Sequence, residues 1–171
     1  MNIFLPYEND IVKSVQSLDD KRLNKQILEC YQLLSNAIKE KSGEIVIGYK
    51  NHPIYVHYKG NIPFLANYGY QCCMEFMRRF DKVHSLHPIF LNYNYQFNSK
   101  CYNGQPEYVP FYMEGSKDSP NCIRTTENVS ELYQKKLIDK WDTDKAKGRN
   151  PKWTNREIPS FYKGVKKWQI D

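Results

Sequence analysis

The sequence lacks any long hydrophobic run. No segment approaches the roughly 18 apolar residues of a membrane-spanning helix, and residues 1–7 are not a basic stretch followed by a long apolar one. We therefore expect no membrane contact, no secretory leader and a cytoplasmic location. Internal repeats and low-complexity tracts are also missing, which argues against solenoid and fibrous architectures.

Paired cysteine motifs are absent as well. The chain has five cysteines, an odd number, and no Cys-x-x-Cys pair. A disulfide framework or a structural zinc site is therefore not expected, and the set fits a reducing compartment. His84 and His87 have a spacing that metal ligands can use, but no carboxylate stands between them in a proline-containing loop. We predict no metal and no other cofactor.

The chain does contain enough apolar and aromatic material for a core. Of its 171 residues, 40% are hydrophobic and 15% are aromatic, and 14 are tyrosines. This length fits a single domain of residues 1–171, because domains typically span about 100 to 200 residues. Tyrosine rings have an apolar body and a polar tip, so a large number of them suits a wet cleft or a stacking surface.

Charge is distributed unevenly along the chain. Residues 1–134 carry 14 Lys plus Arg against 14 Asp plus Glu, whereas residues 135–171 carry 11 against 5 and so hold the whole net charge of +6. Basic and aromatic residues alternate in residues 142–171, which we interpret as a tail packed on the body. This mixture favours contacts with phosphates and exposed bases, and the candidate residues are Arg149, Lys152, Trp153, Arg156 and Tyr162. The alternative is a solvated surface whose aromatics only dock the tail.

A long amphipathic helix is predicted over residues 17–41. Ser17 suits the N-cap, Asp19 and Asp20 stand in the first turn where the helix dipole favours anions, and no Pro or Gly follows before Gly43. Apolar residues recur at spacings of three and four and are expected to face the core: Leu23, Ile27, Cys30, Leu34 and Ile38.

One border of this apolar stripe carries charge. Arg22, Lys25 and Glu29 share a helical face, which predicts a cationic groove with a single carboxylate. Such a groove suits a phosphate-bearing substrate. Alternatively, Lys25 and Glu29 are an ordinary ion pair on a solvated face, which stabilises a helix by only about 0.2–0.5 kcal/mol.

Two further helices complete the predicted body. A helix over residues 63–80 is expected to bury Leu65, Tyr68, Cys72, Phe76 and Phe80 and to leave Glu75, Arg78 and Arg79 outside. A helix over residues 128–141 is expected to turn inward Val129, Leu132, Tyr133 and Leu137. The predicted fold class is mainly α, a compact three-helix domain with an inserted β-hairpin and a basic aromatic C-terminal tail.

The hairpin insertion is predicted within residues 81–124. Apolar and polar side chains alternate over residues 91–97, which is the period of a half-buried strand. Asn103 and Gly104 form a strong hairpin turn, and a second strand follows over residues 108–113. Pro110 makes that second strand an edge strand.

His52 lies in the connector between the first two predicted helices. The following Pro53 restricts this residue to an extended conformation. Its ring either caps the nearby backbone or faces a substrate, and the sequence leaves both interpretations open.

Three motifs stand in an order that a known family shares. They are an aromatic-Leu-Pro-Tyr opening, the segment LDDKRLNKQILE (residues 18–29) and the turn GYKNHP (residues 48–53). A helix ending in Arg-Arg, a further helix and the basic aromatic tail follow. In this arrangement the chain resembles the pyrimidine-dimer DNA glycosylases with AP lyase activity, the endonuclease V type of phages and bacteria. The likeness is clear over residues 1–80 and loose over residues 125–165.

The resemblance implies damaged duplex DNA as the partner and an amine as the nucleophile. In that family the α-amine at the chain start attacks C1′ of the damaged nucleotide and forms a Schiff base, while a glutamate on the first helix supports the proton transfers. The glutamate position falls on Glu29, and the amine belongs to Met1 or Asn2. Because Asn2 is not small, Met1 is expected to stay, which moves the amine by one residue, up to about 3.5 Å.

Two family positions differ in this chain. Arg22 stands where the phage type has a histidine, and Leu28 replaces an arginine that the phage type uses on DNA. If DNA is the ligand, the resemblance requires Lys21, Lys25 or the tail to replace that arginine. Arg78, close to the end of the second helix, is a further candidate for a phosphate contact.

Three hypotheses follow. The first is a DNA N-glycosylase with AP lyase activity on damaged or modified pyrimidines. The second is a viral, non-enzymatic protein that sequesters a nucleotide or cyclic oligonucleotide in the same pocket, with the predicted hairpin as a lid or as the contact of a homo-oligomer. The third is a host-interaction protein in which the catalytic residues have become structural.

Overall fold

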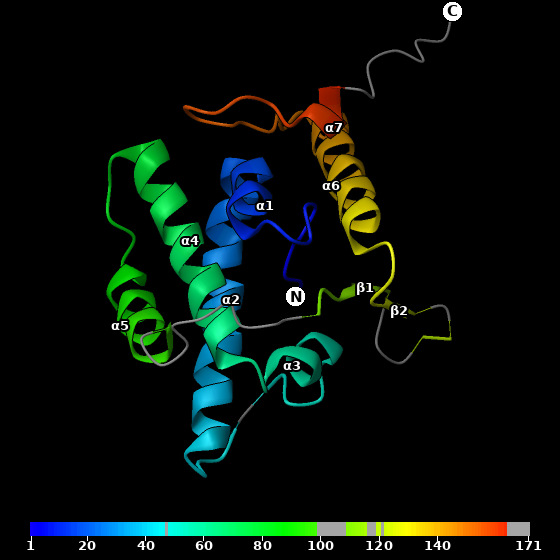
Figure 1. Cartoon of the computed structure of the whole chain (residues 1–171). Helices are drawn as coiled ribbons and strands as arrows, with labels where there is room; N and C mark the ends of the chain where they lie inside the picture. Colours follow the sequence, from blue (N-terminus) through cyan, green and yellow to red (C-terminus); the bar gives the residue numbers. More distant parts are fainter. Residues whose placement is uncertain (47, 99–108, 116–118, 121, 164–171) are drawn as a thin grey trace, which may run out of the picture.

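The computed structural model describes residues 1–46, 48–98, 109–115, 119–120 and 122–163. Within these residues the protein is mainly helical, with seven helices and a two-stranded antiparallel hairpin (Figure 1). The long helices are α2 (Asp20–Lys41), α4 (Ile62–Phe80) and α6 (Val129–Ala146). They correspond to the three predicted helices, so the mainly α prediction is confirmed. The shorter helices are α1 (Ile11–Ser17), α3 (Pro53–Tyr58), α5 (His87–Asn98) and α7 (Ser160–Lys163).

The helical conformation is interrupted between α1 and α2, and the predicted N-cap at Ser17 is wrong. Ser17 is the last residue of α1, and its hydroxyl donates a hydrogen bond to the carbonyl of Ser14. Leu18 is extended, and Asp19 caps α2 by accepting a hydrogen bond from the backbone N–H of Arg22. A carboxylate is as good an N-cap as a hydroxyl, so the cap moved by two residues without cost to the helix.

Helix α5 replaces the strand that was predicted over residues 91–97. The alternating pattern is misleading, because a second apolar series at helical spacing turns Leu86, Phe90, Tyr93 and Phe97 toward the body. Phe90 is fully buried against α4 at Gly69, where an added Cβ would lie 1.9 Å from the Phe90 ring. The close packing of α5 on α4 therefore requires glycine at this position.

The hairpin that does form lies farther along the chain. Strand β1 (Tyr112–Glu114) pairs antiparallel with β2 (Ile123–Thr125), with Tyr112 opposite Thr125. The predicted turn at Asn103 and Gly104 lies outside the described residues. Pro110 precedes β1 and belongs to neither strand. The prediction of a hairpin is confirmed, whereas the prediction of its first strand is wrong.

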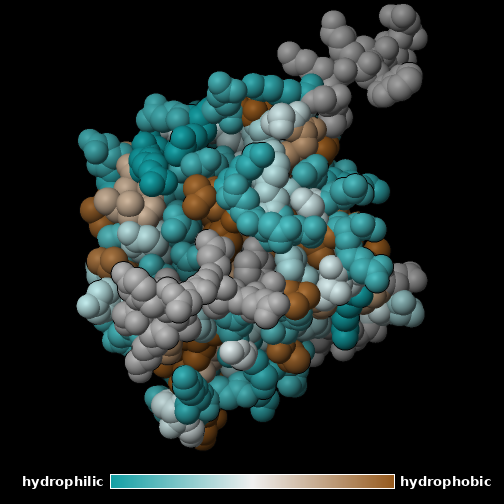
Figure 2. All heavy atoms as spheres, in the orientation of Figure 1, coloured by the Kyte–Doolittle hydropathy of each residue, from teal (hydrophilic) through white to brown (hydrophobic). Residues whose placement is uncertain are grey.

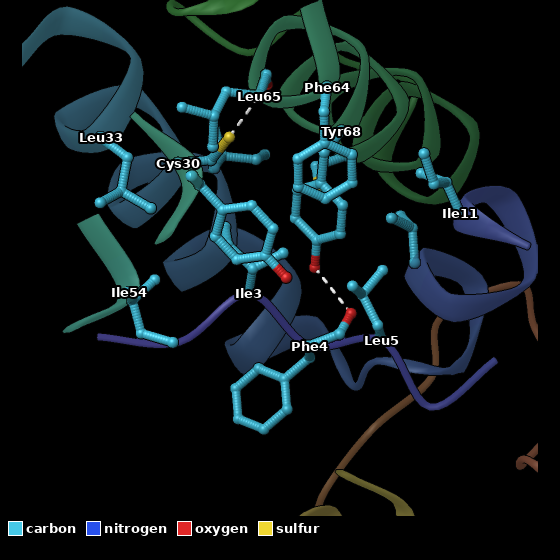
Figure 3. Close-up of a cluster of buried hydrophobic side chains, with 14 of the residues drawn as sticks. Ile3, Phe4, Leu5, Ile11, Cys30, Leu33, Ile54, Phe64, Leu65 and Tyr68 are labelled. Carbon is cyan, nitrogen blue, oxygen red and sulfur yellow. Dashed lines mark hydrogen bonds between the residues drawn. The ribbon is translucent and has the colours of Figure 1, made fainter. Parts of the chain in front are cut away.

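The N-terminal segment is buried in the core beside α2 and α4. Ile3 and Leu5 are fully buried, and Figure 3 shows them with Phe4 among side chains of α2, α3 and α4. The hydroxyl of Tyr68 on α4 lies 3.0 Å from the carbonyl oxygen of Phe4. In Figure 1 this segment lies between α2 and α6. The start of the chain is therefore fixed between two long helices.

Two charged residues that were expected on the outer face of α4 are buried. Glu75 and Arg79 are bonded to each other, and Arg156 of the C-terminal region also binds Glu75. Arg79 in addition contacts Asp20 at the start of α2. Burial of these charges is possible because each has an oppositely charged partner from a distant part of the chain.

The described part of the basic tail, residues 142–163, contacts the body through Trp153. The Trp153 ring lies 4.9 Å from that of Trp141 on α6, and its indole N–H donates to the carbonyl of Ser17. The face seen in Figure 2 is mostly hydrophilic, with apolar residues in scattered patches. None of the helices in the described ranges is both long and apolar enough to cross a membrane.

Candidate active site

The start of the chain lies beside the single carboxylate of the predicted groove. The α-amine of Met1 is 3.8 Å from Glu29 Oε1, and the backbone N–H of Asn2 donates to Glu29 Oε2 at 3.3 Å. The position of Glu29 at the border of the buried stripe of α2 agrees with the helical pattern, and its side chain remains 14% exposed. The amine, the carboxylate and solvent therefore meet at one point.

A cavity of about 500 Å³ opens at this point. Its walls come from the N-terminal segment, α2, the end of β1, α6 and the residues just after α6. Among the described residues, seven cationic side chains line it: Lys21, Arg22, Lys25, Lys136, Lys140, Lys147 and Arg149. Four carboxylates oppose them: Glu29, Glu114, Asp139 and Asp144. The excess of cations makes the cavity attractive to a polyanion.

Arg22 lines this cavity but is held by two carboxylates. Its guanidinium donates to Asp19 at 2.8 Å and to Asp144 of α6 at 2.7 Å. The hydrogen bond from Arg22 holds the pKa of Asp144 below its ordinary value. Arg22 is buried, so it fastens α2 to α6, and the phosphate contact assigned to it stays a prediction.

Asp144 also contacts two more exposed cationic side chains that line the cavity. Lys21 lies 3.4 Å and Arg149 3.0 Å from its carboxylate oxygens. Both side chains are more than half exposed. They can therefore turn from Asp144 toward a bound phosphate without breaking a buried contact.

Three further lysines line the cavity, and two of them, Lys25 and Lys140, interact with Glu29. Lys25 lies 3.6 Å from Glu29 Oε1, so the ion pair expected from the spacing is present. Partial burial lowers the pKa of Lys136, whose ammonium group donates to the carbonyl of Met113. Partial burial also lowers the pKa of Lys140, and repulsion by Arg22 and Lys25 acts in the same direction. A bound anion would relieve this repulsion.

Several residues that the sequence assigned to nucleic-acid binding lie outside the cavity lining. Trp153 is buried against Trp141, and its ring is not available for stacking on a base. Arg156 is bonded to Glu75, and the hydroxyl of Tyr162 lies 3.2 Å from Asp142. Lys152 is exposed. The described structure therefore gives Trp153 and Arg156 a packing role in the tail.

The remaining two candidates also lie away from the amine. His52 is the N-cap of α3, and its Nδ1 accepts a hydrogen bond from the N–H of Ile54. This agrees with the interpretation of a ring that caps the backbone. Arg78 is half exposed and lies 4.0 Å from Glu75. Neither residue lines the cavity around Glu29.

Helix α6 supplies a wall that the sequence interpretation missed. Its cavity-lining residues recur at spacings of three and four along one face: Lys136, Asp139, Lys140, Thr143, Asp144 and then Lys147 beyond its end. The same periodicity that identified the face of α2 could have found this one. The net positive charge of residues 135–171 points instead to the tail, because seven of the eleven cations in this range follow α6.

The chemistry available at this site is that of an amine beside a carboxylate. A chain-terminal amine has an ordinary pKa of about 8, well below that of a lysine, so its uncharged nucleophilic form is easily reached. A nearby carboxylate can accept and return protons and can stabilise a developing cation. No group of three or more His, Cys, Asp or Glu that could hold a metal is found in the described ranges.

Comparison with known proteins gives one result that bears on this site. A family model described as pyrimidine dimer DNA glycosylase matches residues 1–87, just over half of the 171-residue chain. The match contains the N-terminal segment, the charged face of α2 and all of α4, but not α6. No significant match was found among curated proteins or among solved structures. The chain belongs to the pyrimidine dimer DNA glycosylase family.

Proposed function

We propose that this protein is a DNA N-glycosylase with associated AP lyase activity, acting on pyrimidine dimers or other damaged pyrimidines. The observation that carries the proposal is the Met1 amine, 3.8 Å from Glu29 in a cationic cavity of about 500 Å³. Family membership supports a DNA substrate. The cationic side chains around the cavity suit the phosphates that flank a lesion.

In the glycosylase step the uncharged Met1 amine attacks C1′ of the damaged nucleotide. A bond forms between the amine nitrogen and C1′, and the bond between C1′ and the pyrimidine nitrogen breaks. The base leaves with the electron pair of that bond and takes up a proton. Glu29 Oε1 accepts a proton that the amine loses and returns one to the sugar ring oxygen, so that the ring opens to a Schiff base.

The lyase step uses the same groups. The Schiff base makes the C2′ proton acidic, and Glu29 is the nearest carboxylate to the amine that could remove it. Loss of this proton expels the phosphate at C3′ with its electron pair, which cleaves the strand. Water then releases the sugar remnant and restores the amine. Lys25 and Lys140 line the cavity, which supports a role for them in neutralising phosphate charge during these steps.

Trapping of the covalent intermediate tests this proposal. Protein is incubated with a dimer-containing duplex in the presence of borohydride, which reduces the Schiff base to a stable amine. We expect a covalent adduct whose digestion places the DNA on the N-terminal peptide. Undamaged duplex serves as the control. No adduct with any damaged pyrimidine would overturn the proposal.

The identity of the amine can be tested separately. Intact mass shows whether Met1 is the first residue of the purified protein. A variant with two residues added before Met1 moves the amine by up to about 7 Å and should lose the adduct while folding normally. An adduct that persists on an internal lysine would show that a different amine is the nucleophile.

A second candidate function is non-enzymatic binding of a nucleotide or cyclic oligonucleotide. Two observations favour it: the cavity volume lies in the range of small-ligand sites, and exposed Leu28 stands where the phage enzymes have a DNA-binding arginine. Of the hairpin that this hypothesis used as a lid, the predicted first strand is helix α5, and the strands that form are β1 and β2. Calorimetry with a nucleotide panel distinguishes the two functions, because DNA binding weakens steeply with salt.

A further inference from the structure

We propose that Gln26 is a positioning residue that holds the N-terminal amine and Glu29 in reacting geometry. This inference rests on the proposed function and adds a residue that does not touch the substrate. Gln26 lies one turn before Glu29 on α2 and is only 1% exposed. Its primary amide contacts both the start of the chain and the carboxylate.

Both ends of the Gln26 amide are bonded. Its Nε2 donates to the carbonyl of Asn2 at 2.8 Å and to Glu29 Oε2 at 3.0 Å. Its Oε1 accepts from the backbone N–H of Phe4 at 3.1 Å and lies 2.9 Å from the hydroxyl of Tyr68. The Phe4 N–H can only donate and the Asn2 carbonyl can only accept, so the amide has a single orientation.

The contacts with Asn2 and Phe4 act on the backbone of the N-terminal segment. The carbonyl of one residue and the N–H of the residue two positions later point to the same side of an extended chain, and a neighbouring strand would bond both. Gln26 takes the place of that strand with one side chain. It thereby fixes the direction in which the segment ends, one residue from the reacting amine.

Tyr68 supports the amide from the other side. Its buried hydroxyl lies 3.0 Å from the carbonyl oxygen of Phe4 (Figure 3). It also lies 2.9 Å from Gln26 Oε1, so its proton is shared by the two acceptors. Tyr68 belongs to α4, which packs against α2. The orientation of Gln26 is therefore set by the core as well as by the N-terminal segment.

The contact with Gln26 gives the two carboxylate oxygens of Glu29 different surroundings. Oε2 accepts from Gln26 and from the N–H of Asn2, whereas Oε1 faces the Met1 amine at 3.8 Å and Lys25 at 3.6 Å. Oε2 is held in place, and Oε1 is left for proton transfer. A displacement of about 1 Å between reacting groups can slow a reaction on the order of 100-fold, so loss of this restraint should be visible in the rate.

Two substitutions test the proposal. Gln26→Met keeps the length of the side chain and removes all its hydrogen bonds. Gln26→Leu also removes these hydrogen bonds without adding a charge beside Glu29, and it is the variant to use should Gln26→Met not fold. Gln134→Met is the matched control, because Gln134 also bonds the N-terminal segment, at Pro6, where the hydroxyl of Ser130 remains as a second donor.

The measurement is the rate of borohydride-trapped adduct formation on dimer-containing DNA. For both Gln26 variants we expect a rate at saturating DNA about 10- to 100-fold below that of the wild type, with KM within about twofold and the same final fraction of adduct. Gln134→Met should react at the wild-type rate. A purely structural role would instead reduce the final fraction and affect all three variants according to their loss of stability.

The possible results separate this inference from the proposed function. If the wild type forms the adduct and a folded Gln26 variant forms it within twofold of the wild-type rate, the positioning role is overturned and the proposed function stands. If the wild type forms no adduct, both are overturned. A slower reaction that is equal in the Gln26 and Gln134 variants would also overturn the positioning role.

Discussion

Glu29 and Glu75 are both glutamates on long helices, but their surroundings differ in every respect that matters for chemistry. Glu75 is 1% exposed, and its two oxygens accept hydrogen bonds of 2.7 to 2.8 Å from Arg79 and Arg156. Glu29 is 14% exposed and lines a cavity, and its Oε1 makes longer contacts, with the Met1 amine at 3.8 Å and with Lys25 at 3.6 Å. A carboxylate whose hydrogen bonds are all short and buried holds a fold together. One with an oxygen facing a cavity can exchange protons.

The comparison also separates the two cationic regions of the molecule. Around Glu75, Arg79 and Arg156 form internal ion pairs that connect α4 with the start of α2 and with the C-terminal region. Around Glu29 the lysines outnumber the carboxylates and stay accessible from the cavity. We therefore expect substitutions in the first region to change stability and substitutions in the second to change activity or binding.

Glu29→Gln should have the largest effect. The amide keeps an acceptor for Asn2 and Gln26, so the fold is preserved, but it can neither take up the proton of the amine nor stabilise a cation. Loss of a general base typically slows a reaction about 100- to 10,000-fold. Strand cleavage of dimer-containing DNA should therefore nearly disappear, as measured by single-turnover kinetics, while DNA affinity and melting temperature change little.

Glu40→Gln is the matched control for this substitution. Glu40 lies on the same helix, outside the cavity lining, and is bonded to Lys59. Its replacement should leave the cleavage rate unchanged. A Glu29→Gln protein that cleaves as fast as the wild type would remove Glu29 from the mechanism and would end the distinction between the two glutamates.

Glu75→Gln should have the opposite signature. Removing one partner of a buried ion pair costs about 3–5 kcal/mol, and we expect the lower part of that range because Arg156 is 31% exposed and Arg79 keeps Asp20. Urea unfolding measures this loss. Below the unfolding transition, the cleavage rate per folded molecule should equal that of the wild type. Glu157→Gln is the control, since Glu157 is 92% exposed and its pair with Lys163 should contribute almost nothing.

These contrasts show which features of the site can be recognised in the sequence. The position of Glu29 and its pairing with Lys25 follow from helical spacing alone, because neighbours three and four residues apart share a face. The burial of Glu75 does not, because its partner Arg156 is 81 residues away. The contact of Arg22 with Asp144 does not follow either, since the two residues are 122 positions apart. Spacing along a helix locates a charged face, but only the tertiary fold decides which charges have partners.

The helix boundaries and the hairpin teach a related lesson about local patterns. Helix α4 was predicted to within one residue, because its apolar stripe and its N-terminal proline agree. Residues 91–97 were assigned to a strand because two periodicities coexist there. These residues form a helix because Phe90 packs against Gly69. This contact between α5 and α4 cannot be recognised from the local sequence pattern. Leu91 and Tyr95, two apolar members of the alternating pattern, lie on the exposed side of α5.

Acid should weaken the Glu75 region in a predictable way. Burial by itself raises the pKa of Glu75, but the hydrogen bonds from Arg156 and Arg79 outweigh it, so the net pKa lies below the ordinary value of 4.5. Its contribution to stability is then fully present above that value and is lost as the pH falls below it toward the lowered pKa. Urea unfolding between about pH 6 and pH 3 should show the wild type losing stability more steeply than Glu75→Gln. Parallel curves would show that Glu75 does not take part.

Lys140 offers the smallest and most specific test of the cavity region. Its ammonium group has no ion-pair partner within 4.0 Å among the described residues. Partial burial together with Arg22 and Lys25 lowers its pKa and outweighs the attraction of Glu29 and Asp144. A phosphate would supply the missing partner, so Lys140→Gln should weaken DNA binding and reduce the slope of log affinity against log salt by about 0.9, the value for one lost phosphate contact. Stability should not fall, because the substitution removes repulsion. Lys82→Gln, at an exposed position after α4, should leave the slope unchanged. Equal slopes for both variants would mean that α6 does not face DNA, and the cationic excess around Glu29 would then need another explanation.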